Sequence, residues 1–126
     1  MSFWLLVCAV NGFVAVAAGA FGAHALGDRI PQTDMSAFET GVQYHLVHTL
    51  ALGLIAMASA QSSLPQQPVS AAGWAFLAGI VLFSGSLYFL GVTGSRALVL
   101  ITPMGGVAFL IGWVALAWAA LRSVPN

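Results

Sequence analysis

The stretch that decides the fold is residues 44–60, with the sequence YHLVHTLALGLIAMASA. After its two histidines this stretch is almost entirely apolar, and its length approaches the roughly 20 residues that an α-helix needs to cross about 30 Å of hydrocarbon. His45 and His48 are three positions apart and therefore share one face of that helix. The stretch predicts a transmembrane helix that carries two imidazoles near one end.

Three further apolar runs of similar length occur, at residues 3–23, 71–92 and 97–121. The chain has 126 residues, of which 60% are hydrophobic and 5% charged, whereas a soluble domain carries roughly 25% charged residues. A transmembrane β-barrel would need short strands that alternate apolar and polar residues, and these runs are apolar on every side. The sequence therefore predicts an all-α integral membrane four-helix bundle, a single domain over residues 1–126, with helices at about 3–26, 37–60, 71–92 and 97–122.

The balance of charge excludes nucleic acid as a partner. Three basic and three acidic residues give a net charge of zero, which does not fit a nucleic-acid-binding protein. The expected partners are the lipid bilayer and either further copies of the chain or another membrane protein. The single cysteine, Cys8, has no intrachain mate and is expected to pack as a small apolar residue. A cleaved signal peptide is not favoured, because no positive charge precedes Arg29.

The segments between the runs are short. Ser36 and Glu39 have the spacing of a capping box and predict that the second helix begins there. Residues 61–70 contain two prolines among Gln and Ser, and they are expected to form a linker without helix. Arg29 and Arg96 fall on one side of the membrane and Arg122 on the other, which favours an orientation with both termini outside.

Threading the four runs through a bilayer places His24 at the end of the first helix and the other two histidines at the start of the second. All three are then expected in one layer near a single face of the membrane, which makes this layer the candidate ligand-binding site. Its members are His24, Glu39, Tyr44, His45, His48, Tyr88, Arg96 and Thr102, with Asp28, Arg29 and Asp34 close by. Three further polar residues are expected near mid-membrane, namely Asn11, Ser84 and Ser86.

Three interpretations of this layer remain open. The imidazoles can hydrogen-bond neighbouring helices and hold them together, or they can relay protons or line a small polar pocket. They can also bind zinc, copper or iron, with His24, His45 and His48 as candidate ligands and Glu39 as an alternative third ligand. The glutamate of an H-E-x-x-H motif is missing, so no metal or other cofactor is assigned. No nucleophile elbow, phosphate loop or carboxylate pair within a span indicates an enzyme.

Small residues recur at intervals of four in the first and third runs, and they predict close approach of helices, either inside the bundle or between copies. Examples are Ala15, Gly19 and Ala23, then Ala71, Ala75 and Gly79, with Gly105, Gly106 and Gly112 in the fourth run.

Four motifs together carry a family resemblance: GAFGAHAL at 19–26, TGVQYHLVHTLAL at 40–52, FSGSLY at 83–88 and ITPMGG at 101–106. In this order they resemble the YgdD-like family of small four-span bacterial inner-membrane proteins, a domain of unknown function that is similar to a small eukaryotic transmembrane protein. The resemblance implies the fold and a multi-pass location in the cell inner membrane. It implies no activity and no catalytic residues.

We therefore expect an integral inner-membrane protein that acts as a structural, interaction or assembly protein. The alternatives are a small-solute or proton pathway formed by an oligomer, and a metal- or haem-binding membrane protein.

Overall fold

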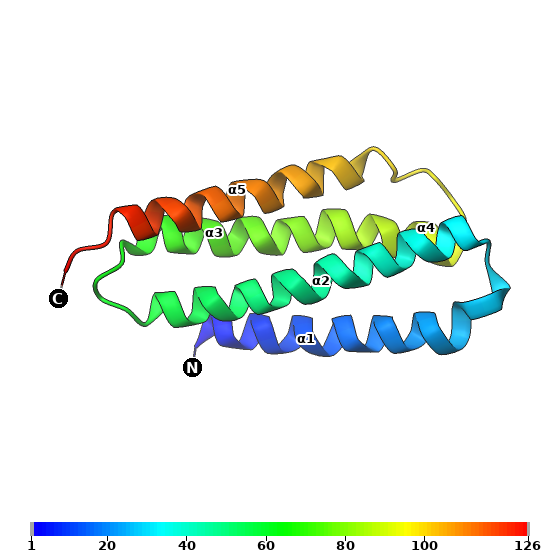
Figure 1. Ribbon diagram of the computed structural model, residues 1–126, viewed down its shortest axis with the longest axis horizontal. Helices are drawn as coiled ribbons and strands as arrows, with labels where there is room; N and C mark the ends of the chain where they lie inside the picture. Colours follow the sequence, from blue (N-terminus) through cyan, green and yellow to red (C-terminus); the bar gives the residue numbers. More distant parts are fainter. Residues whose placement is uncertain (1, 126) are drawn as a thin grey trace.

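The computed structural model describes residues 2–125. It contains four long helical segments, each antiparallel to the one before it in the sequence (Figure 1). The first segment is α1 (Phe3–Phe21), which continues through the π-helical turn η1 (Gly22–Leu26) and the 3-10 turn η2 (Gly27–Arg29). The second is α2 (Gln32–Ser59). The third is α3 (Gln66–Gly79), which continues through the π-helical turn η3 (Ile80–Ser84) into α4 (Gly85–Thr93), and the fourth is α5 (Ile101–Leu121). Both ends of the described chain lie at the same end of the bundle.

All four segments are long enough to span a membrane, with 27, 28, 28 and 21 residues. Even α5, the shortest, extends about 31 Å at 1.5 Å per residue, which matches the hydrocarbon thickness. The segments are apolar on their outer faces as well, since Phe13 of α1 is 78% exposed and Leu110 of α5 is 66% exposed. In a bilayer these faces contact lipid. The predicted all-α four-span membrane fold is confirmed.

Helix α2 is the central element, because it packs against α1, α3, η3 and α4. It begins at Gln32, five residues before the predicted start, and the predicted capping box at Ser36 is wrong. Pro31 precedes the helix with its φ fixed at −56°, and a fixed φ of this kind suits a helix start. The extra turn also buries Asp34 and Met35, so its contacts outweigh the local capping signal.

Two further helix starts also differ from the predicted ones. Helix α3 begins at Gln66 instead of residue 71, and Pro68 lies in its first turn, where the N–H that proline lacks would have no intrahelical partner. The linker is correspondingly shorter than predicted. Helix α5 begins at Ile101 instead of residue 97, because residues 97–100 form turns and Ile101 N donates to Leu98 O at 2.9 Å.

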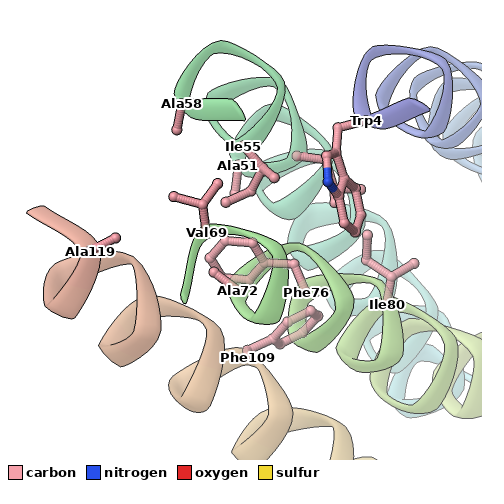
Figure 2. Close-up of a cluster of buried hydrophobic side chains, with 11 residues drawn as sticks. Trp4, Ala51, Ile55, Ala58, Val69, Ala72, Phe76, Ile80, Phe109 and Ala119 are labelled. Carbon is pink, nitrogen blue, oxygen red and sulfur yellow. The ribbon is translucent and has the colours of Figure 1, made fainter. Parts of the chain in front are cut away.

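The larger apolar core lies between α2, α3 and α5, with Trp4 of α1 at its edge (Figure 2). Two phenylalanines pack reciprocally on glycines there. Phe76 of α3 lies over Gly112 of α5, where an added Cβ would come within 2.5 Å of the ring, and Phe109 of α5 lies over Gly79 of α3. The glycines predicted for close packing are therefore used within the bundle at these two positions.

A smaller cluster lies at the other end, where Phe38 of α2 fits between two glycines. Gly22 of η1 and Gly91 of α4 both face its ring, and an added Cβ at either position would come within 2.8 Å of the Phe38 side chain. Phe38 therefore fixes the register of three helices at one depth.

Candidate functional site

The polar interior is organised around His45, which is buried in α2 and bonds to two other helices. Its Nε2 lies 3.0 Å from Oδ1 of Asn11 in α1, and its Nδ1 lies 2.8 Å from the hydroxyl of Tyr88 in α4. Asn11 in turn donates from Nδ2 to the Val7 carbonyl at 2.9 Å. One chain of hydrogen bonds thus joins α4, α2 and α1.

The donor and the acceptor of each of these hydrogen bonds can be assigned from the Val7 carbonyl onward. A backbone carbonyl can only accept, so the Asn11 amide nitrogen points to Val7 and its oxygen points to His45. That oxygen also only accepts, so Nε2 of His45 carries the hydrogen. Nδ1 of the neutral imidazole is then an acceptor, and the Tyr88 hydroxyl donates to it. Both ring nitrogens of His45 are therefore matched.

His48 is held in the opposite tautomer. Its Nδ1 donates to the Tyr44 carbonyl at 2.8 Å, and its Nε2 accepts from the indole Nε1 of Trp113 at 3.1 Å. The imidazole also stacks on Phe109 of α5, with ring centroids 3.6 Å apart and an angle of 10° between the planes. His48 therefore joins α2 to α5 through Nε2 and its ring face, while its Nδ1 bonds within α2.

Two serines continue this pattern between the helices. The Ser84 hydroxyl of η3 is fully buried and donates to the Gly41 carbonyl of α2 at 2.7 Å. The Ser86 hydroxyl of α4 contacts the Thr102 hydroxyl of α5 and also bonds to the Phe83 carbonyl at 2.9 Å. Residues two apart on a helix point in nearly opposite directions. Ser84 therefore bonds the third helical segment to α2 on one side, and Ser86 bonds it to α5 on the other.

The remaining predicted residues lie elsewhere. Arg96 is exposed and pairs with the buried carboxylate of Asp34, Nη2 to Oδ1 at 3.4 Å, which fastens the α4–α5 connection to the start of α2. Tyr44 is 43% exposed and packs on Phe83, with ring centroids 4.6 Å apart. Glu39 and His24 are both exposed.

The single layer predicted for the three histidines is therefore wrong. His24 lies in η1, in a turn whose Gly22 packs on Phe38, whereas His45 is two helical turns further along α2, about 10 Å from Phe38 at 1.5 Å per residue. Because α2 begins at Gln32, His45 and His48 are its fourteenth and seventeenth residues. His45 bonds to Asn11, which was predicted to belong to a separate mid-membrane group.

Metal ligation is not favoured by this arrangement. Within residues 2–125, no three His, Cys, Asp or Glu side chains lie close enough to share a metal ion. The ring nitrogens of His45 and His48 are also taken by protein partners. A metal ion would have to displace those bonds.

Sequence reasoning did not identify two residues of this region. The indole N–H of Trp113 in α5 donates to Nε2 of His48. Thr49 is 5% exposed, and its hydroxyl is the buried side-chain polar atom that lacks a partner among residues 2–125. Neither environment has a local sequence signal, because each depends on which residues of other helices lie opposite.

The fold and this internal network define the class: a polytopic α-helical membrane protein whose buried polar groups bond between helices. Residues 18–106 match the family described as "Protein of unknown function (DUF423)", and the chain belongs to that family. It is a multi-pass protein of the cell inner membrane.

Relatives cover nearly the whole chain. The UPF0382 membrane protein YwdK of Bacillus subtilis (strain 168) is 46% identical over 123 residues, which cover 97% of this chain and 98% of the relative. The UPF0382 inner membrane protein YgdD of Escherichia coli (strain K12) is 42% identical, over 95% of this chain and 90% of the relative. A UPF0382 membrane protein of Haemophilus influenzae is 40% identical over 95% and 94%. No solved structure matches this chain.

Proposed function

We propose that this chain is a structural and interaction protein of the inner membrane, not an enzyme, and that it self-associates or assembles with another membrane protein. Its buried polar residues fasten the four helices to one another. The functional surface is then the outside of the bundle.

The observation that carries this proposal is the complete matching of His45 and His48. Each imidazole uses one nitrogen as a donor and the other as an acceptor, always to a group of this chain. A proton relay needs a group that can pass a proton on, yet the chain from Tyr88 through His45 and Asn11 ends on the Val7 carbonyl. An amide and a carbonyl are poor proton carriers, so hydrogen bonding between helices is the role that fits best.

Conservative substitution of the histidines tests this role. Glutamine at position 45 offers one acceptor for Tyr88 and one donor for Asn11, and asparagine at position 48 offers the same pair of functions. We expect His45→Gln and His48→Asn to retain the oligomeric state of the wild type, measured by sedimentation velocity in mild detergent.

A flux assay separates this role from a conducting one. Wild-type protein in vesicles is expected to pass protons no faster than protein-free vesicles do. Faster flux in the wild type that His45→Gln abolishes would favour the pathway alternative, and a wild type that remains monomeric and binds no membrane protein would remove the interaction role.

A further inference from the structure

Two polar side chains of α2, Glu39 and Gln43, lie exposed on the outside of the bundle. Neither has a hydrogen-bond or salt-bridge partner within the described chain, residues 2–125. Glu39 follows Phe38, whose ring lies 6.4 Å from that of Phe21, and Phe21 of α1 is 46% exposed. The carboxylate is therefore level with a large apolar side chain that faces outward, and Gln43 lies about 6 Å further along the helix axis.

Polar groups at such depths usually face protein or a water-filled cavity, because hydrocarbon does not solvate them. A side chain near the end of a span can extend to the headgroups, but Gln43 is the twelfth residue of α2, about 16 Å from its start. The position of Gln43 thus calls for a protein partner on this face.

The two polar residues begin a regular stripe along α2, which we call the seam. Its positions are spaced by four and three residues in alternation, and Leu46, Leu50 and Met57 of the stripe are 39%, 74% and 66% exposed. This spacing is the heptad pattern by which two helices pack side by side at about +20°, the commonest crossing in membrane bundles. In full, the seam consists of Glu39, Gln43, Leu46, Leu50, Gly53 and Met57, of which Gly53 is half-buried beside Cys8 of α1.

We propose that a second copy of this chain covers the seam, so that two α2 helices pair in parallel about a two-fold axis along the membrane normal. The inference rests on the interaction role proposed above and names its surface. Such an axis places each seam residue at the depth of its own counterpart. Two Gln43 amides then meet, and each supplies the donor and the acceptor that the other lacks. Glu39 of one copy accepts from the remaining Gln43 N–H of the other, one helical turn away.

The surface beside the seam leaves room for a partner. A groove of about 280 Å³ runs between α1 and α2, and both polar seam residues and Leu46 line it. On the side of the first helical segment the groove is lined by Gly19 of α1 and by Gly22 and Ala23 of η1, so no bulky side chain of that segment lines it.

Cysteine crosslinking tests the seam in purified protein reconstituted into vesicles, where other copies are the sole protein partner. All variants carry Cys8→Ala, which removes the one native cysteine. Seam variants Leu46→Cys, Leu50→Cys and Met57→Cys are compared with Val81→Cys and Val114→Cys, which are 64% and 69% exposed on η3 and α5. After oxidation with copper phenanthroline, we expect the seam variants to form disulfide-linked dimers severalfold more than the two controls.

A second experiment measures how much the Gln43 side chain contributes to dimerisation. Gln43→Leu is expected to weaken dimerisation about tenfold, the effect of one or two interhelical hydrogen bonds in a membrane, while Val81→Leu leaves it unchanged.

If the wild type sediments as an oligomer but the seam and control variants crosslink equally, the seam is overturned and the interaction role stands. Seam crosslinks that form in native membranes only, to a different protein, would assign the surface to that protein, and a monomeric wild type would count against both proposals.

Discussion

Nε2 of His45 donates to Oδ1 of Asn11 at 3.0 Å, and this bond joins α2 to α1 inside the four-span bundle. The same imidazole accepts from Tyr88 of α4. One side chain of the central helix therefore fixes the rotation of three helices, and its loss should affect the stability of the whole bundle.

Removing the imidazole of His45 should lower the free energy of unfolding, whereas replacing it with an amide should change that free energy little. His45→Leu leaves the Asn11 oxygen and the Tyr88 hydroxyl without partners, and unpaired buried groups cost about 1–3 kcal/mol. His45→Gln restores a donor and an acceptor and is expected within about 1 kcal/mol of the wild type. The free energy of unfolding, measured by steric trapping in bicelles, distinguishes the two variants, and equal losses would show that the hydrogen bonds contribute little.

The Tyr88 hydroxyl and His45 should be energetically coupled. Tyr88→Phe removes the donor without changing the ring, and we expect it to lower the unfolding free energy by about 0.6–1.7 kcal/mol, the range of interhelical hydrogen bonds in membranes. In the His45→Leu background the same substitution should cost almost nothing, because its partner is already gone. A cycle in which the two effects simply add would contradict the bond between Tyr88 and His45.

Close packing of α3 on α5 gives a prediction that does not depend on polar groups. Gly112→Ala places a Cβ within 2.5 Å of the Phe76 ring, and overpacking of this kind costs about 1–3 kcal/mol. Gly85→Ala is the matched control, because nothing lies within 4 Å of its added Cβ, and the helix propensity of alanine should make it neutral or stabilising. Thermal unfolding followed by circular dichroism tests the difference, and a fully tolerated Gly112→Ala would mean that α3 and α5 lie further apart.

The fold could be predicted from the sequence because lipid imposes a simple rule. Apolar runs of about 20 residues cross as helices, and each of the four runs falls on one of the four long helical segments. Helix ends were less predictable: the turns added at Gln32 and Gln66 are mostly polar, and α2 gains its first turn from the burial of Asp34 and Met35.

The candidate site was predicted in its residues more than in its arrangement. Interhelical bonding of Ser84 agrees with its polarity within a span. The partner of each histidine depends on the rotation and register of another helix, which no local pattern encodes. Thus His24, although a histidine near the same boundary, lies apart in η1, while Trp113, far along the sequence, meets His48.

The tautomers of the two buried histidines test the central claim most directly. Solid-state ¹⁵N NMR of histidine-labelled protein in lipid bilayers at neutral pH separates protonated from unprotonated ring nitrogens, and His45→Gln and His48→Asn assign the signals. We predict that the hydrogen is on Nε2 in His45, which donates to Asn11, and on Nδ1 in His48, which donates to the Tyr44 carbonyl. The reverse pair of tautomers, or rapid exchange between the two forms at either residue, would contradict the network of hydrogen bonds that holds the four helices together.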